Sequence, residues 1–274
     1  MSNSTGESTA EKVATSTPMG WVARIGLGAR ATVYLVMGGL ALAVAAGGSK
    51  SSVDQRGAIR TLLHQPFGTF LVLLLAFGFI AYALWRFSEV AFGPDGEKDG
   101  FAPRAKSFVR GVAYSIFAFG AVSILLGSKQ SQSRQQEDAA NTALHLPGGQ
   151  VLLGLIGAAF VIAGVLMVWE GWKTKFLAYF DYLPPTRRAV VVWLGRVGTI
   201  TRGLVFALAG ALVMVGAWAA DTSTAGGIND VVQTILDWPF GGALVALMGL
   251  GLLLFGVYGV AETLWRHVPD GDSS

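Results

Sequence analysis

Six long apolar segments constrain the fold of this chain more than any other feature. A helix needs roughly 20 apolar residues to cross about 30 Å of hydrocarbon, and six segments meet that length: residues 29 to 47, 67 to 92, 108 to 127, 150 to 172, 199 to 220 and 241 to 265. Residues 71 to 84 are apolar on every side, whereas the strands of a membrane barrel alternate apolar with polar residues. The segments therefore predict an all-α, polytopic membrane protein with six transmembrane helices.

The composition agrees with a membrane protein and excludes several kinds of site. Hydrophobic residues make up 53% and charged residues 14% of the 274, against roughly a quarter charged in soluble proteins. The chain has no cysteine, which excludes disulfides, thiolate metal sites and cysteine nucleophiles. The net charge of +3 and the pI near 9.3 could indicate nucleic acid, but membrane proteins gather basic residues on one face through topology alone. We therefore expect no nucleic-acid partner.

The distribution of basic residues predicts the orientation. Of the 20 Lys and Arg residues, 15 lie on the side shared by the N-terminus, the loops 93 to 107 and 173 to 198, and the C-terminus, and 5 lie on the other side. The positive-inside rule then places both termini in the cytoplasm. The first 18 residues are rich in Ser, Thr, Glu and Ala, so we expect a disordered cytoplasmic tail that is not cleaved as a signal peptide.

A threefold internal repeat organises the polar residues. Each odd-numbered segment begins with an Arg, five residues and a second Arg: Arg24 and Arg30, Arg104 and Arg110, Arg196 and Arg202. Each even-numbered segment begins with Pro-x-Gly, and a Glu follows 23 residues after the Pro: Glu89, Glu170 and Glu262. These spacings predict three two-helix repeats at residues 19 to 95, 96 to 180 and 181 to 268, followed by a short C-terminal tail at 269 to 274.

The polar stretches before each Pro-x-Gly complete the expected architecture. Residues 55 to 64 and 227 to 237 have apolar residues at helical spacing with polar residues between them, which predicts short interfacial helices that lead into the even span through Pro at its first turn. Because each unit contains two spans, all three units share one orientation. We therefore expect a pseudo-threefold six-helix bundle.

At this level of detail the chain resembles a known family. The motifs are Arg30-Ala31 with Tyr34, Gln65-Pro66-Phe67-Gly68, and Gly78, Tyr82 and Trp85-Arg86. They resemble an uncharacterised bacterial membrane-protein family, catalogued as domain of unknown function 1206, whose members carry three tandem two-helix units. The resemblance covers about residues 20 to 267 and implies the fold and a bacterial cytoplasmic-membrane location, but no activity. The middle unit departs most, because its even helix does not end in Trp-Arg.

The repeated Arg and Glu residues are the first candidate site. Arg30, Arg110 and Arg202 start the odd spans, and Glu89, Glu170 and Glu262 come about 33 Å along the even spans from their outer ends, so both sets share one layer on the cytoplasmic side. A buried carboxylate is costly unless it is paired. In one interpretation each Glu pairs with an Arg of its own or a neighbouring unit and locks the bundle. In the other, the six residues form a gate or an ion site in which pairs exchange partners.

A second candidate site lies on the opposite side of the membrane. Two residues before each Pro stand His64, His145 and Asp237, which a threefold bundle could bring together as weak candidates for a metal site. The alternative is that these positions take polar residues that cap helices, with Asp237 as an N-cap. We expect no resident metal.

The sequence contains no enzymatic motif in a credible context, so we expect no enzyme and no cofactor. Two functions remain. The first is a structural, lipid-binding or partner-binding membrane module, with membrane lipids and either a protein partner or a homo-oligomer as partners. The second is a small-solute or ion transporter that uses the Arg and Glu layer. A water-filled axis would favour transport, and a solidly packed axis would favour the module.

Overall fold

The computed structural model describes residues 17–47, 52–93, 100–180, 183, 185–220 and 227–266. Its helices are α2 (Thr17–Ala45), α3 (Gln55–Leu63), α4 (Gly68–Phe92), α5 (Phe101–Leu125), α6 (Gln132–Leu144), α7 (Gly149–Trp172), the 3₁₀ helix η1 (Lys175–Tyr179), α8 (Pro185–Ala219), α9 (Ile228–Leu236) and α10 (Gly241–Trp265). The expected tail at 269 to 274 and residues 1 to 16 of the expected N-terminal tail lie outside the described residues.

Six of these helices are long and apolar enough to cross a membrane, which confirms the predicted number of spans. The even spans α4, α7 and α10 begin and end within one residue of the predicted bounds. The odd spans begin earlier than predicted: α2 at Thr17, α5 at Phe101 and α8 at Pro185. The prediction followed hydropathy, but a helix satisfies its own backbone and does not end where apolar residues end. The repeated arginines therefore lie within the odd helices.

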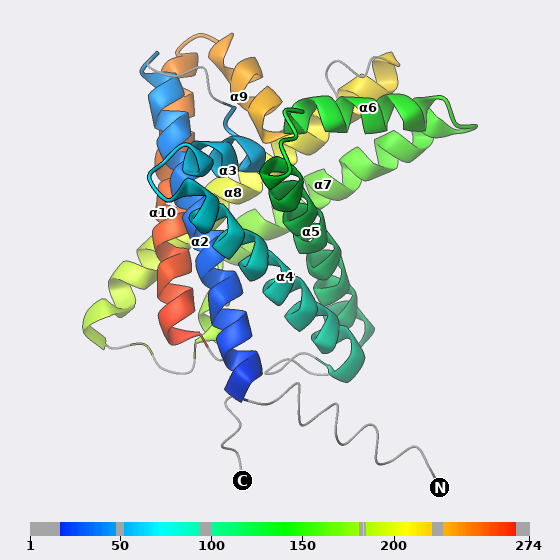
Figure 1. The fold of residues 1–274 in the computed structure, drawn as a ribbon. Helices are drawn as coiled ribbons and strands as arrows, with labels where there is room; N and C mark the ends of the chain where they lie inside the picture. Colours follow the sequence, from blue (N-terminus) through cyan, green and yellow to red (C-terminus); the bar gives the residue numbers. More distant parts are fainter. Residues whose placement is uncertain are drawn as a thin grey trace, which may run out of the picture.

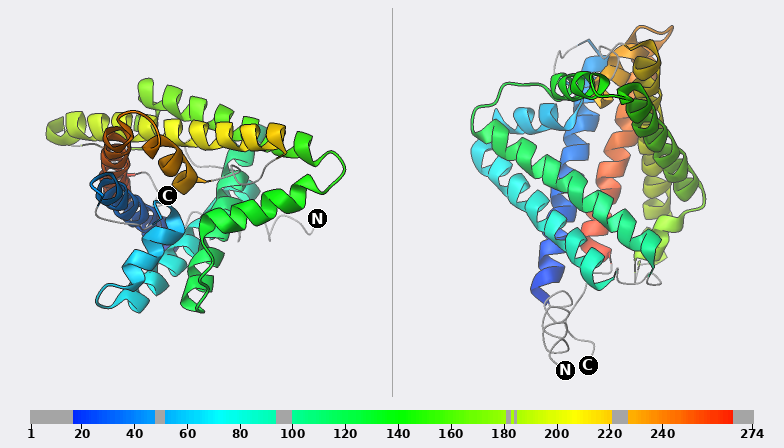
Figure 2. Two further views of the ribbon diagram at one scale, coloured as in Figure 1. Left: turned by 90° about the horizontal axis from the view of Figure 1, so that it is seen from above. Right: turned by 90° about the vertical axis from the view of Figure 1, so that its right-hand side faces the viewer.

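The spans are arranged as three helix pairs. Each even helix packs most extensively against the odd helix of the next unit, giving α4 with α5, α7 with α8, and α10 with α2. In the last pair the third unit packs against the first. Figures 1 and 2 show α3, α6 and α9 at the end of the bundle opposite to the start of α2 and the end of α10. We call these two ends the short-helix face and the terminal face.

Contacts within the units break the threefold pattern. Helix α2 packs on α4 and α8 packs on α10, but α5 and α7 have no comparable contact in the described part of the chain. Equivalent positions show the difference: Gly78 of α4 lies against Ala29 and Gly251 of α10 lies against Thr201, whereas Ala159 of α7 is exposed. The ring of helices is therefore open at the middle unit.

The sequence of α7 explains the opening. Where α4 carries Tyr82 and Trp85, and α10 carries Phe255 and Tyr258 at the equivalent positions, α7 carries Ala163 and Leu166. All four aromatic residues are buried, and Tyr82 lies against Gly26 of α2 and Phe255 against Gly198 of α8, in each case the odd helix of the same unit. Aromatic side chains bury the most surface per residue, so their loss removes the contact that would hold α7 against α5.

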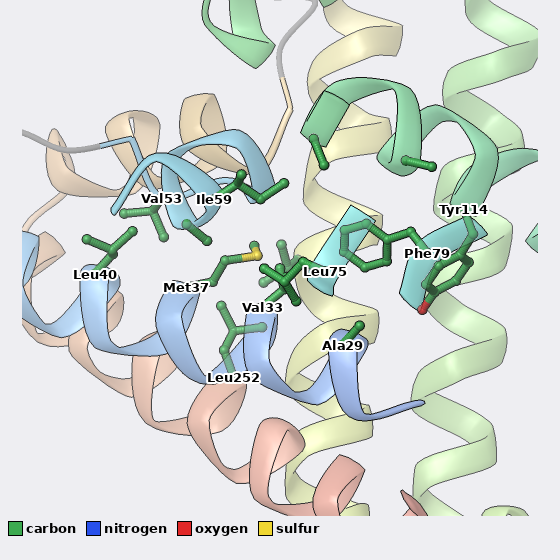
Figure 3. Packing of buried hydrophobic residues seen from close by; sticks show 14 of the residues in the cluster. Ala29, Val33, Met37, Leu40, Val53, Ile59, Leu75, Phe79, Tyr114 and Leu252 are labelled. Atoms are coloured by element: carbon green, nitrogen blue, oxygen red, sulfur yellow. The ribbon is translucent and has the colours of Figure 1, made fainter. Parts of the chain in front are cut away.

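The main core lies between units 1 and 3. Figure 3 shows Val33 and Met37 of α2 with Leu252 of α10, and Phe79 of α4 beside Tyr114 of α5. Buried residues of α3 and α9 continue this cluster toward the short-helix face. The core therefore joins the beginning and end of the chain and leaves α7 at the edge.

The Pro-x-Gly turn is the same in all three units. The residue between Pro and Gly has a left-handed backbone in each case, with φ of 60° at Phe67, 77° at Gly148 and 61° at Phe240. The proline stands two residues before the even helix and not in its first turn, which corrects the prediction. The turn needs its glycine: a Cβ on Gly68 would lie 2.1 Å from the carbonyl oxygen of Leu63.

Close approach of α7 and α8 gives a direct stability test. A Cβ on Gly164 would lie 2.5 Å from the backbone of Ala207, whereas nothing lies within 4 Å of one on Gly154 of the same helix. We expect Gly164→Leu to lower the free energy of unfolding in detergent by about 1–3 kcal/mol or more through overpacking. Gly154→Leu should cause no loss, because leucine is the better helix former. Equal effects of the two variants would contradict this packing.

Candidate functional site

Glu262 of α10 is the centre of a buried ion-pair cluster. Its side chain accepts a hydrogen bond from Nη2 of Arg30, and its other oxygen accepts one from Nη1 of Arg266 at 3.1 Å. Only 3% of the Glu262 surface is exposed. Arg30 belongs to the first unit and Glu262 to the third, so the pair joins neighbouring units, one of the two arrangements that the sequence left open.

Glu89 has a different set of partners. It accepts hydrogen bonds from Arg86 Nη1 and from Ser107 Oγ, both at 2.6 Å. Arg86 also donates to Tyr82 Oη at 2.7 Å and lies over the Trp85 ring, 4.2 Å from its centroid. Glu89 is therefore paired within its own helix and bonded to α5, and Arg86 has taken the place that Arg110 would have filled by symmetry.

Glu170 departs furthest from the predicted pattern. Its carboxylate lies 3.5 Å from Lys106 Nζ, and both side chains are about one-third exposed. Lys106 also donates to Tyr179 Oη at 3.2 Å. An ion pair this exposed contributes little stability. The Glu of the middle unit thus lies near a surface lysine, whereas the equivalent Glu262 of the third unit is buried and paired with Arg30.

Arg110 and Arg202 keep no carboxylate partner among the residues that the structure describes. The guanidinium carbon of Arg202 lies 5.1 Å from the Phe255 centroid, 5.3 Å from Phe206 and 5.5 Å from Tyr34. Arg110 lies close enough to Tyr82 and Glu262 to interact with both electrostatically. The predicted ring of three Arg–Glu pairs is therefore realised once, at Arg30 and Glu262.

We use the term charged layer for the charged residues that surround these contacts: Arg30, Arg86, Arg110, Arg202, Arg266, Glu89 and Glu262. The roles of Arg86 and Arg266 were missed from the sequence because neither recurs in the repeat. Their signal was the helical spacing, since Arg86 stands three residues before Glu89 and Arg266 four residues after Glu262. Such neighbours share one face of a helix.

The first arginine of the repeated motif has a separate role. Arg24 Nη1 donates to the carbonyl oxygens of Thr263 at 2.8 Å and Leu264 at 3.1 Å, at the end of α10. Arg104 donates in the same way to Val90 at 3.2 Å, at the end of α4. Both arginines thus bond free carbonyl groups at the end of an even helix in another unit: the third unit for Arg24 and the first unit for Arg104.

The predicted outer site is not assembled. His64, His145 and Asp237 are the C-caps of α3, α6 and α9, and all three are exposed. The expectation that Asp237 is an N-cap was wrong, because the following turn separates it from α10. Within the described ranges, no group of three or more His, Asp or Glu side chains could hold a metal ion.

Residues that the repeat did not mark join the units on the short-helix face. Arg56 of α3 donates to the carbonyl oxygen of Gln130 at 3.0 Å and to Ser123 Oγ at 3.1 Å, both in the middle unit. The backbone N–H of Val53 donates to Asn229 Oδ1 of α9 at 3.1 Å. Residues at the start of the first unit's short helix thus form hydrogen bonds with both other units.

Comparison with known proteins decides the family. A family model described as "Domain of Unknown Function (DUF1206)" matches residues 25–93, 105–174 and 197–266. The chain belongs to this family. Each DUF1206 match covers the two spans of one unit: α2 and α4, α5 and α7, or α8 and α10.

One curated relative supports the same assignment. The chain is 27% identical over 250 residues to "Uncharacterized protein YxxB" of Bacillus subtilis (strain 168), which covers 89% of this chain and 90% of the relative. No solved structure matches the chain. The chain is therefore a membrane-spanning member of the DUF1206 family with three tandem units, and neither comparison names an activity.

The inter-unit ion pair gives a test by double mutation. We expect Glu262→Gln to cost about 3–5 kcal/mol of unfolding free energy, because Arg30 and Arg266 are left buried without their counter-ion. Combining it with Arg30→Gln should cost less than the two single losses together, with a coupling of about 1 kcal/mol or more. Reversible unfolding in detergent measures each variant. The matched pair Arg30→Gln and Glu89→Gln should be much closer to additive, and equal coupling in both cycles would contradict the assigned partners.

Asp54, the N-cap of α3, gives a pH-dependent test outside the spans. Burial raises the pKa of its carboxyl above the ordinary value, against a hydrogen bond from the Gly57 N–H at 2.7 Å. The folded protein then holds the proton more tightly than the unfolded chain, so the free energy of unfolding should fall as pH rises between the unfolded and folded pKa values.

Asp54→Asn should remove that slope, because the amide oxygen keeps the capping bond without a charge to bury. Urea unfolding of the detergent-solubilised protein at several pH values measures it. The control Asp237→Asn changes an exposed C-cap carboxyl and should keep the wild-type slope. A slope that survives in Asp54→Asn would contradict this assignment.

Proposed function

We propose that the protein is a non-catalytic module of the bacterial cytoplasmic membrane that binds a membrane constituent, and that it does not carry solutes along its axis. The observation that supports this most is the buried pairing within the charged layer, which joins unit 1 to units 2 and 3. There Glu262 is bonded to two arginines and Glu89 to Arg86 and Ser107, all buried. Exchange of these partners during transport would expose buried charges at a cost of several kcal/mol.

The surroundings of the layer favour the same function. Aromatic rings pack directly beneath it: Tyr34 on Phe255 at 4.7 Å and Tyr82 on Tyr114 at 4.2 Å between centroids. Two grooves of about 410 and 370 Å³ lie elsewhere, one beside α6 and the other between α2 and α4. Neither groove is lined by a residue of the charged layer, so neither gives a solute a route to it.

The orientation is part of the proposal. Both described ends of the chain lie at the terminal face, where Arg24 bonds the end of α10. The excess of Lys and Arg on that side supports a cytoplasmic terminal face by the positive-inside rule. Membrane lipids and either a protein partner or a second copy are the partners of such a module.

Single cysteines test the module against the transporter, since the native chain has no cysteine background. We expect Ser107→Cys, next to Glu89, to stay unmodified when a membrane-impermeant thiol reagent is applied outside intact cells. Thr142 on α6 and Ala178 on η1 are both exposed, the first on the short-helix face and the second on the terminal face. Thr142→Cys should therefore react from outside, and Ala178→Cys only after the cells are opened. Rapid modification of Ser107→Cys from outside would reveal a water path through the bundle and favour transport. Reversed labelling of the two controls would overturn the orientation.

A further inference from the structure

The charged layer carries more positive than negative charge. It contains the guanidinium groups of Arg30, Arg86, Arg110, Arg202 and Arg266 but only the carboxylates of Glu89 and Glu262. At the edge of the hydrocarbon an uncompensated charge is costly and requires a counter-ion. Arg110 and Arg202 are the two arginines of the layer that form no ion pair with a carboxylate in the described part of the chain, so an added anion would lie next to them.

The unsatisfied polar atoms in the layer are all potential donors. Buried atoms without a hydrogen-bond partner in the described structure include Arg30 Nε, Arg86 Nε, Arg202 Nε and Tyr258 Oη. A guanidinium can only donate, and a phenol donates through its one proton. Since buried donors are normally satisfied, a ligand here must supply acceptor oxygens.

The surroundings of Arg202 favour a ligand that offers two oxygens to the same guanidinium. Its guanidinium carbon lies 5.1 to 5.5 Å from the centroids of three aromatic rings, and cation–π contacts stabilise the charge without using its N–H groups. The N–H groups at its edge are then left for an oxyanion, which arginine binds through two parallel bonds. Phosphate fits this chemistry and the excess of positive charge.

The open side of the bundle offers an apolar surface on α5, which carries Arg110, and on α7, which packs against the helix that carries Arg202. Val109 of α5 is 65% exposed, whereas Ala29 at the equivalent position in the first unit is 7% exposed. Ile156 of α7 is 41% exposed, whereas its equivalent Leu75 is 5% exposed. Arg110 follows Val109 directly, so the basic residue stands at the terminal-face end of this uncovered surface.

We propose that this gap binds an anionic phospholipid, with its phosphate on Arg110 and Arg202 and its acyl chains along the open faces of α5 and α7. The assignment rests on the proposed lipid-binding module and names its ligand class. Charge complementarity selects the anionic headgroup, because the half-buried Arg110 and Arg202 form no ion pair with a carboxylate among the residues that the structure describes. The apolar faces of α5 and α7 match the acyl chains, which would pack on them by van der Waals contact, because lipid tails are as apolar as these side chains.

Native mass spectrometry of the full chain in mild detergent tests the proposal by titration with phosphatidylglycerol, phosphatidylcholine or inorganic phosphate. We expect one phosphatidylglycerol adduct at low lipid concentration. Arg202→Gln and Arg110→Gln should each weaken it by about tenfold or more, as expected for a charge-assisted hydrogen bond. The matched control Arg188→Gln, exposed on the same helix as Arg202, should weaken it only by the few-fold that general attraction of basic residues allows.

A variant that leaves every arginine in place tests the gap itself. Ala159→Phe fills the position where the equivalent Gly78 and Gly251 meet a neighbouring helix, so it should reduce lipid binding while leaving the charged layer intact. The thermal midpoint of each variant, measured without lipid, separates lost binding from lost folding.

Several results would overturn the proposal. Equal losses of phosphatidylglycerol binding in Arg202→Gln and Arg188→Gln would mean that only general surface attraction holds the lipid. Displacement of phosphatidylglycerol by inorganic phosphate at equal concentration would assign the arginines to a free oxyanion. A dimer that retains no lipid would assign the gap to a second copy of the chain. None of these depends on Ser107→Cys labelling, so failure of the lipid site is distinguishable from failure of the module.

Discussion

The burial of Glu262 between Arg30 and Arg266 is the interaction on which the rest of the bundle depends. It joins the last helix to the first, and the core of α2, α4 and α10 packs directly below it. A carboxylate so deeply buried is costly unless it is paired and hydrogen-bonded, and both oxygens of Glu262 accept from arginines. Because Arg30 and Glu262 lie in different units, the pair fixes how the third unit meets the first, and the Pro-x-Gly turns then fix where the short helices lie.

The threefold pattern is kept where the backbone requires it and lost where side chains decide. The turn before each even helix is the same in all three units, since its glycine faces the carbonyl groups of the preceding short helix. The pairing of each even helix with the next odd helix is kept as well. The contact between α5 and α7 is lost because Ala163 and Leu166 replace the aromatic residues of the other units. A repeat of three similar units has thus produced one bundle with a single open side.

The two faces of the bundle are held by different chemistry. On the terminal face, arginines bond carboxylates and the carbonyl groups at helix ends, as Arg24 does with α10. On the short-helix face the acceptors are neutral: Arg56 donates to the carbonyl oxygen of Gln130 in the middle unit, and the Val53 N–H donates to Asn229 of α9. In the described part of the chain the ion pairs between basic side chains and carboxylates therefore all lie on the terminal face.

The amino-acid sequence by itself determined the six spans, the three units, the even-helix bounds and the short helices, because hydropathy and repeat spacing are local properties of the chain. It also placed the Arg and Glu residues in one layer. Only the tertiary structure decided which partner each residue takes, since that choice depends on residues outside the repeat: Arg86 captures Glu89, Lys106 lies beside Glu170, and Arg266 joins Arg30 at Glu262. The open middle unit could not be predicted either, because the contacts that a missing aromatic side chain would have made form only once the helices pack together.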